Sequence, residues 1–238
     1  MAQIGFRGER RFRQDQGIGL CKGHERPESN GKCEGEEIMP IIITDIEQRS
    51  PEWFAAICGN VGASSIDKII TTKGEPSKSR NEYMMTLCAE RITGKQEFMQ
   101  PTQAMLNGIE REDEARNLFE LVRGVEVQQV GLVYTDDKSA HCSPDGLIGE
   151  NSGLEIKNPI SKTHIKYLLE NKLPTEYFCQ VQFSLYVSGR GSWWFMSHYP
   201  GIRPFMVECF RDEKWIEKCD HEIKAFNEEL DDMVRRLA

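Results

Sequence analysis

Two carboxylates and one ammonium group are spaced along the chain so that they could act together. Asp145 is separated by nine residues from the triplet Glu155-Ile156-Lys157. If the triplet lies on a β-strand, Glu155 and Lys157 project from the same face while Ile156 faces the core. A neighbouring strand that begins near Asp145 can bring its carboxylate to the same point. The pattern therefore predicts one centre that contains two acids and a lysine.

Such a centre has the chemistry of a magnesium-dependent phosphodiesterase. Carboxylates and a backbone carbonyl are hard oxygen ligands of the kind that Mg²⁺ uses, and water and a substrate phosphate can complete the octahedron. The ammonium group of Lys157 can position the attacking water or stabilise the charge that develops at phosphorus. The competing interpretation is turn chemistry beside an exposed strand pair. The flanking residues Ser143-Pro144 and Gly146 favour the catalytic interpretation.

The strands that must position these residues lie in the second half of the chain. After Gly124 the apolar period changes from that of a helix to that of short strands bounded by glycine and polar residues. The expected strands are Val125–Val127, Gly131–Tyr134, Ala140–Ile148, Gly153–Lys157, Ser192–Tyr199 and Phe205–Phe210.

Helical segments surround these strands. Ser50-Pro51 combines a capping residue with a proline at the first helical position, and Gly62–Ser65 is a small-residue turn in which Ser64 can cap the next helix. The other expected helices are Asn81–Gly94, Thr102–Arg123, Tyr177–Val187 and the amphipathic segment Glu213–Leu237. We therefore expect one domain over residues 41–238.

Residues 1–40 differ from the rest of the chain. They are rich in Gly, Arg, Glu and Gln and show no apolar period, so they are expected to be a disordered leader or tail. Gly35-Glu36-Glu37 resembles a translated ribosome-binding tract, which gives the hypothesis that Met39 is the natural start.

Composition narrows the classes of protein. The net charge of −8 argues against nonspecific coating of nucleic acid by the whole surface, although a local basic channel remains compatible with it. The eight cysteines contain no C-x-x-C pair, which disfavours a zinc or iron–sulfur site. There is neither an apolar run of about 20 residues nor a secretory signal, so we expect a cytoplasmic protein without a membrane partner.

Three runs of the sequence resemble the bacteriophage lambda exonuclease family, the YqaJ-type recombinase branch of the PD-(D/E)xK nucleases. They are Cys142–Gly146, Gly153–Pro159 and Gln180–Ser184, and the similarity extends from about Trp53 to the C-terminus. The resemblance implies an α/β fold whose central mixed β-sheet is flanked by helices, a restriction-endonuclease-like core. It also implies a ring-shaped homotrimer around double-stranded DNA and 5′-to-3′ exonuclease digestion of one strand. Two Mg²⁺ ions, replaceable by Mn²⁺, are the implied cofactors, and a phage-type single-strand annealing protein is a candidate partner.

The resemblance also assigns roles to individual residues. Asp145 and Glu155 match the family's metal-binding acids, Ile156 the residue whose carbonyl binds metal, and Lys157 the catalytic lysine. Glu112 matches a further acid on a helix near the metals. Gln180 matches an active-site glutamine. Ser64, Ser143 and Tyr177 fall at positions associated with the DNA phosphate. Read without the resemblance, Glu112 would be a solvated acid, and Gln180 and Tyr177 the polar edge of a packed helix.

One position departs from the family pattern. Where the family has an arginine that helps to bind a terminal 5′-phosphate, four residues after Trp53, this chain has Ile57. An isoleucine cannot make a bidentate contact with phosphate. Lys68, Lys162 and Lys166 are the residues considered as replacements. The departure leaves two alternatives to an exonuclease: a structure-specific or restriction-type endonuclease on the same fold, and a degenerate module that only binds DNA.

Overall fold

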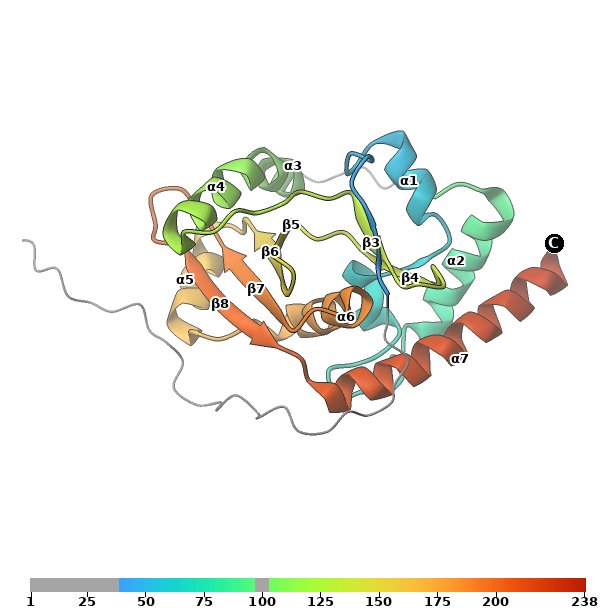
Figure 1. Cartoon of the computed structure of the whole chain (residues 1–238). Helices are drawn as coiled ribbons and strands as arrows, with labels where there is room; N and C mark the ends of the chain where they lie inside the picture. Colours follow the sequence, from blue (N-terminus) through green and yellow to red (C-terminus); the bar gives the residue numbers. More distant parts are fainter. Residues whose placement is uncertain (1–38, 97–102) are drawn as a thin grey trace, which may run out of the picture. The chain divides into compact units, whose positions relative to one another are not determined.

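The strands form two four-stranded mixed sheets flanked by helices (Figure 1). The computed structural model describes residues 39–96 and 103–238. The first sheet has the order β1-β3-β4-β2, with β2 and β4 parallel. The second has the order β5-β6-β7-β8, with β6 and β7 parallel. The predicted α/β class and mixed pairing are confirmed, and the strands divide between two sheets. The strands are β1 Ile41–Ile43, β2 Val61–Gly62, β3 Leu132–Tyr134, β4 Ala140–Cys142, β5 Gly146–Ile148, β6 Ser152–Lys157, β7 Ser192–Ser197 and β8 Phe205–Phe210.

The chain changes from one sheet to the other at Ser143–Asp145. The prediction of one strand over Ala140–Ile148 is wrong, because β4 belongs to the first sheet and β5 to the second. Pro144 has no N–H to donate to a strand ladder, which explains why regular pairing stops there. Gly146 resumes it at a point where an added Cβ would overlap the side chain of Val127. Asp145 thus lies at the junction of the two sheets.

The expected strand Val125–Val127 is also wrong. The segment pairs only through a single bridge, in which Gln128 and Leu147 exchange two backbone hydrogen bonds of 2.8 Å. Val127 itself is buried against α4 (Glu112–Arg123), so its apolar character serves packing rather than a sheet.

Several helices begin and end as their capping residues predict. Helix α1 (Pro51–Ile57) is capped by Ser50, whose hydroxyl accepts a hydrogen bond from the Trp53 N–H at 3.1 Å. Helix α2 (Arg80–Thr93) ends at Gly94 in the left-handed conformation. Helix α7 (Glu213–Leu237) is capped by Asp212 and covers the expected range. Figure 1 shows α7 lying along α2, where Arg80 donates to Glu222 at 2.5 Å.

Other helices differ from the predictions. The expected helix Thr102–Arg123 is two helices, α3 (Gln103–Glu110) and α4, separated by a turn at Arg111, where φ is −99° and ψ is 0°. This break puts Glu112 in the first turn of α4. Ser64 lies inside the short 3₁₀ helix η1 (Ala63–Lys68), which follows Gly62 and has no side-chain cap, so the predicted capping role is wrong.

The helices after β6 were predicted in part. Helix α5 (Ser161–Glu170) was not predicted, and α6 (Phe178–Ser188) follows a short 3₁₀ turn, η2 (Thr175–Tyr177). No helix in the described ranges combines the length and hydrophobicity that a membrane crossing needs. The interpretation of residues 1–40 concerns residues that, apart from Met39 and Pro40, lie outside the described ranges, and it stays a prediction.

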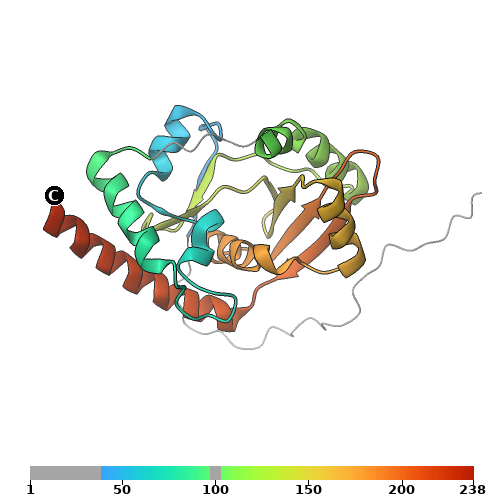
Figure 2. The same cartoon turned by 180° about the vertical axis from the view of Figure 1, so that it is seen from behind.

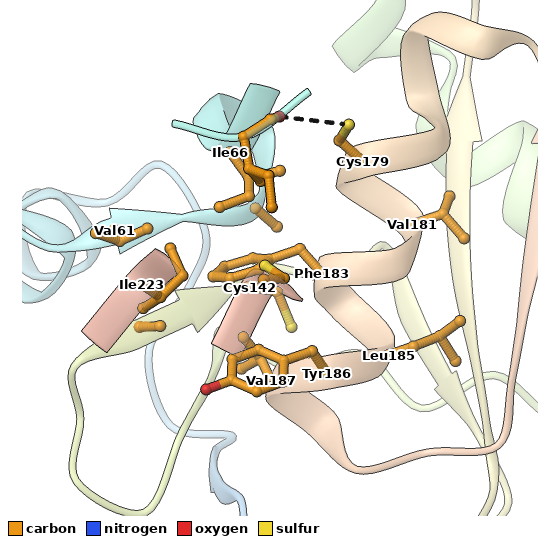
Figure 3. Close-up of a cluster of buried hydrophobic side chains, with 14 of the residues drawn as sticks. Val61, Ile66, Cys142, Cys179, Val181, Phe183, Leu185, Tyr186, Val187 and Ile223 are labelled. Carbon is orange, nitrogen blue, oxygen red and sulfur yellow. Dashed lines mark hydrogen bonds between the residues drawn. The ribbon is translucent and has the colours of Figure 1, made fainter. Parts of the chain in front are cut away.

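Helix α6 forms the centre of the main core. Every residue from Val181 to Ser188 is buried, as is Cys179. Figure 3 shows Phe183 and Tyr186 turned toward η1, β4 and α7, and Val181 and Leu185 on the opposite side of α6. The Cys179 thiol donates to the Ile70 carbonyl. A helix buried on all sides must pair its polar side chains, and Gln182, Ser184 and Ser188 each donate to a backbone carbonyl.

The second sheet separates two layers of helix (Figures 1 and 2). On one face, Leu154, Ile156 and Met196 pack against α4 through Phe119. On the other face, Trp193 and Phe195 belong to the core around α6, and Tyr167 of α5 lies against Phe195. Because side chains alternate along a strand, β6 sends Ile156 toward α4 and its neighbours Glu155 and Lys157 toward α6. The two layers therefore decide which partners each residue of the triplet meets.

Candidate active site

Glu155 and Lys157 lie side by side on the α6 face of β6. The Lys157 Nζ is 2.5 Å from the Glu155 Oε1. The same oxygen accepts a hydrogen bond of 2.8 Å from the Gln180 Nε2, on the first turn of α6. Glu155 is buried, whereas the Lys157 side chain keeps 28% of its surface exposed. The structure thus brings together three of the predicted site residues, with the lysine facing outward.

Asp145 approaches β6 from the edge opposite β7. Its N–H donates to the Leu154 carbonyl at 3.0 Å, and its Oδ2 accepts from the Ile156 N–H at 2.5 Å. The Lys157 carbonyl accepts from the His198 N–H and so points toward β7. Since successive carbonyls of a strand point to opposite edges, the Ile156 carbonyl faces the Asp145 side. One carboxylate and one carbonyl therefore share this edge.

Glu112 joins the site through Arg116, a residue that the sequence analysis missed. The Arg116 Nη2 donates to the Glu112 Oε1 at 3.0 Å, and its Nε donates to the Asp145 carbonyl at 2.9 Å. Arg116 is buried, next to Ala115 and three residues before Phe119 in the packed face of α4. An arginine at an apolar position of an amphipathic helix was the available signal, because a buried charge needs partners.

The electrostatics follow from burial and from the crowding of acids. Burial, and then the negative charges of Glu155 and Glu112, raise the pKa of Asp145 well above its usual value. Burial alone would lower the pKa of Lys157, but the charges of Glu155 and Asp145 outweigh it and raise that pKa. Lys157 is therefore a protonated ammonium group, suited to holding negative charge rather than to accepting a proton.

The oxygen ligands fit a hard divalent cation that the phosphate of the substrate also helps to hold. Across residues 39–96 and 103–238, no three His, Cys, Asp or Glu side chains form a ready-made metal cage. Mg²⁺ is commonly bound by one or two carboxylates, with water and phosphate completing its shell. Asp145 and Glu155, with the Ile156 carbonyl, supply such a set. Burial raises the pKa of Asp145, and the charges of Glu155 and Glu112 raise it further, whereas Lys157 lowers it.

The residues predicted to contact DNA are placed differently from one another. Tyr177 turns its ring beneath Lys157, with the Nζ 5.1 Å from the ring centroid. Ser143 is half-buried at the sheet junction, and Ser64 is exposed on η1. Among the described hydrogen bonds, neither serine reaches Asp145, Glu155 or Glu112.

Ile57 lies in the core and not in the site. It packs with Leu132 and Tyr134 in a small cluster beneath α1. Two of the lysines considered as replacements have other contacts: Lys68 lies over the Tyr83 ring at 5.0 Å, and Lys166 pairs with Glu170 at 3.8 Å.

A cavity of about 570 Å³ lies beside the acids. Its wall includes the loop from Thr44 to Arg49 together with Glu112, Arg116 and Asp145. The Arg49 Nη2 donates to the Glu112 Oε2 at 2.6 Å. The two oxygens of Glu112 are therefore held by two different arginines.

A polar contact links the end of β6 to α3. The Asn158 Nδ2 donates to the Gly108 carbonyl at 3.0 Å, and the His198 Nδ1 lies 3.2 Å from the Asn158 Oδ1. His198 was not among the site residues expected from the sequence. Through these contacts Asn158, the residue after Lys157, is fixed relative to α3, which is followed by α4 and Glu112.

Comparisons with known proteins identify a family and a fold. Residues 52–191 match the model of the YqaJ-like viral recombinase domain. The chain is 33% identical to the alkaline exonuclease LHK-Exo from Laribacter hongkongensis, with a TM-score of 0.72, over 79% of this chain and 96% of that one. The same enzyme is also known in complex with dAMP. A phage-related exonuclease from Haemophilus somnus 129PT shares the fold at 15% identity and a TM-score of 0.60, over 75% of this chain and 96% of that one. No curated protein gave a significant match.

Proposed function

The chain belongs to the YqaJ-like viral recombinase domain family and is a nuclease that acts on DNA, and from this premise we propose that it is a Mg²⁺-dependent exonuclease. The family and enzyme class predicted from the sequence are confirmed. We propose further that the enzyme removes one strand of linear duplex DNA from 5′ to 3′ and serves phage-type recombination. The observation that carries the proposal is that Asp145, at the edge of β6, lies beside Glu155 and Lys157 on the α6 face of the same strand.

In this proposal the acids and one carbonyl hold the metal. Asp145, Glu155 and the Ile156 carbonyl are the ligands, and Glu112 assists from α4. The family resemblance implies two Mg²⁺ ions, with Mn²⁺ as a substitute, and bound cations would offset the repulsion among the acids. When bound, the metal supplies Lewis-acid chemistry: it activates water and neutralises charge on the scissile phosphate and the leaving 3′-oxygen.

The remaining residues orient the reactants. Lys157, being protonated, donates hydrogen bonds to the scissile phosphate or to the attacking water and stabilises the negative charge that develops. Gln180 fixes the Glu155 carboxylate through its amide nitrogen, which leaves its carbonyl oxygen able to accept a hydrogen bond from water. Tyr177 supports the Lys157 side chain from below.

The DNA contacts and partners in this proposal rest on the family resemblance. Ser64, Ser143 and Tyr177 would contact DNA phosphates, and a homotrimer would encircle double-stranded DNA in the cytoplasm. A single-strand annealing protein would receive the product. The complex of LHK-Exo with dAMP, a nucleoside 5′-monophosphate, supports release of 5′-mononucleotides by this chain as well.

The test is a time course on linear duplex DNA labelled at each 5′ or 3′ end, with and without a 5′-phosphate, beside closed circular duplex. We expect Mg²⁺-dependent release of mononucleotides from the 5′-ends and an intact circle. The variants Asp145→Asn and Lys157→Ala should lose at least a hundredfold in kcat, because each removes one charged member of the site. Cleavage of the circle would indicate the endonuclease alternative, and full activity of either variant would overturn the site assignment.

A further inference from the structure

The loop from Thr44 to Arg49 is fixed to the segments that lead to Asp145. The Gln48 Nε2 donates to the carbonyls of both Val130 and Pro144, at 2.9 Å each. On its other side the loop touches Gly131, where an added Cβ would overlap the Ile46 carbonyl. These contacts make the loop a rigid wall of the cavity beside the acids.

Arg49 occupies a backbone conformation that arginine rarely adopts. Its φ is 69°, in the left-handed region that favours glycine. A residue held in such a conformation by its surroundings is a reason to ask what its side chain does. Ser50, the next residue, caps α1, so the direction in which Arg49 leaves the loop is set on both sides.

The Arg49 side chain lies over Glu112 and remains accessible. Its Nη2 is 2.6 Å from the Glu112 Oε2, and 43% of its side-chain surface is exposed. The other oxygen of Glu112 is already held by Arg116. Glu112 therefore keeps one arginine partner if Arg49 moves to another anion.

Of the two arginines that line the cavity within the described part of the chain, Arg49 has the more exposed side chain and fewer described hydrogen bonds. Arg116 is buried, and its three nitrogens donate to the Asp145 carbonyl, to Asp113 and to Glu112. Arg49 makes one described side-chain contact, to Glu112, although a guanidinium group has five N–H donors. More acidic residues than arginines line the cavity. A phosphate would therefore enter together with the metal ion and would need a cationic side chain of the protein as a partner.

We propose that Arg49 is a DNA-binding residue of this nuclease that grips a phosphate of the substrate strand in the cavity beside Asp145 and Glu112. The inference rests on the proposed function and extends it to a named substrate contact. The guanidinium group exchanges part of its contact with Glu112 for bidentate hydrogen bonds to the phosphate, whose geometry matches its paired N–H groups. Either a terminal 5′-phosphate or an internal phosphodiester supplies this chemistry.

The substitution Arg49→Gly separates function from folding. Glycine suits a φ of 69°, so the variant should melt at the wild-type temperature or above it. Lys138→Gly is the matched control, because Lys138 is also a cationic residue with a positive φ of 58°, in the turn between β3 and β4. It removes the same charge and relieves the same backbone conformation at a different place in the fold.

The binding arm measures fluorescence anisotropy of a labelled duplex with Ca²⁺ in place of Mg²⁺ at several salt concentrations. For Arg49→Gly we expect about tenfold weaker binding and a salt-dependence slope lower by about one, which are the effects of losing one phosphate contact. Lys138→Gly should bind as the wild type does, and Arg49→Lys should keep the salt slope while binding less tightly.

The kinetic arm compares 5′-phosphorylated and 5′-hydroxyl duplexes at saturating Mg²⁺. If Arg49 grips the terminal phosphate, wild-type KM differs between the two ends and Arg49→Gly removes the difference. If Arg49 grips an internal phosphodiester, the KM of Arg49→Gly rises equally on the 5′-phosphorylated and the 5′-hydroxyl duplex.

Two results would overturn the proposal. One is wild-type DNA affinity and KM in Arg49→Gly. The other is an Arg49→Gly enzyme whose only defect is weaker binding of Mg²⁺, which would mean that Arg49 only supports Glu112. If the wild type binds duplex without digesting it, the proposed function fails while the binding arm still decides the role of Arg49.

Discussion

At the scale of single residues, one buried arginine links two acidic residues of the site. Arg116 reaches the Glu112 carboxylate and the Asp145 backbone from one buried guanidinium group. A guanidinium group can donate to the Glu112 carboxylate and to the Asp145 carbonyl at the same time, because its N–H groups lie in one plane and point in fixed, different directions. The distance between Glu112 and Asp145 therefore depends on a positioning residue that touches neither metal nor DNA in our proposal.

Arg116→Lys should weaken catalysis more than substrate binding. Lysine keeps the charge but cannot bond Glu112 and the Asp145 carbonyl together, so we expect kcat to fall about a hundredfold with a smaller change in KM. The Mg²⁺ concentration that gives half-maximal activity should rise. Steady-state kinetics over a Mg²⁺ titration measure all three quantities.

Arg123→Lys is the control for that experiment, since Arg123 lies on the same helix and its guanidinium group stacks on Trp194 at 4.0 Å, at the opposite end of α4. It should change neither kcat nor the Mg²⁺ dependence. Equal kinetics for Arg116→Lys and the wild type would show that Glu112 and Asp145 need no such bridge.

At the scale of elements, the site depends on the parallel pairing of β6 with β7. Gly153 pairs with Trp193, and the register continues to Lys157 opposite Ser197. The Trp193 ring covers Gly153 so closely that an added Cβ would overlap ring atoms. Glu155 and Lys157 follow on the same strand, so any shift of β6 at Gly153 moves them as well.

Gly153→Ala should therefore destabilise the fold and lower activity. Forcing a methyl group against a buried ring typically costs about 1–3 kcal/mol. Urea denaturation followed by tryptophan fluorescence measures the change in the free energy of unfolding.

Gly108→Ala is the matched control, because nothing lies within 4 Å of an added Cβ there and alanine favours a helix. It should leave stability unchanged or raise it by up to about 1 kcal/mol. Equal stability for the two variants would contradict the importance that we give to the Trp193 contact.

At the scale of the whole molecule, buried ionisable groups link stability to pH and to metal. His141 is buried on β4, and its Nδ1 has no hydrogen-bond partner among the described residues. Burial lowers the pKa of His141 from 6.5 to about 4. At the site, the negative charges of Glu155 and Glu112 raise the pKa of Asp145, and a bound cation would offset these charges.

His141 should make the protein less stable in mild acid. Below pH 6.5 the unfolded chain takes up a proton that the folded chain refuses until about pH 4. Its contribution is thus complete above pH 6.5 and is lost as the pH falls toward 4, by at most about 3 kcal/mol. Urea denaturation at several pH values should show a shallower decline for His141→Phe than for the wild type. His221→Gln, at an exposed site on α7, should leave the decline unchanged, and the same decline in all three proteins would refute the assignment.

Divalent metal should stabilise the whole fold through the site. A cation that binds the folded chain at a hundred times its Kd adds about 2.7 kcal/mol, or roughly 5–10 °C in Tm for a domain of this size. We expect Ca²⁺ or Mg²⁺ to raise the Tm of the wild type. Asp145→Asn should respond little, and its metal-free form should melt above the metal-free wild type because repulsion among the acids is lost. A Tm that ignores metal in the wild type would argue against the proposed ligands.

Local patterns in the sequence determined much of this protein. Alternation along a strand placed Glu155 and Lys157 on one face, and capping residues such as Ser50 and Asp212 set the ends of helices. These features depend on neighbours a few residues apart, which a sequence displays directly. The family was predicted from three short runs, Cys142–Gly146, Gly153–Pro159 and Gln180–Ser184, and is confirmed.

Only the tertiary structure decided what surrounds the triplet. The change of sheet at Asp145 and the bridge through Arg116 depend on contacts between segments that are distant in the chain. Arg49 reaches Glu112 across 63 positions, and Arg116 reaches Asp145 across 29. Lysines were the residues expected to replace the cation that is missing at Ile57, whereas the structure puts Arg49 over the acids. Period and capping describe only local geometry, so they carry no information about which guanidinium group folding brings to which carboxylate.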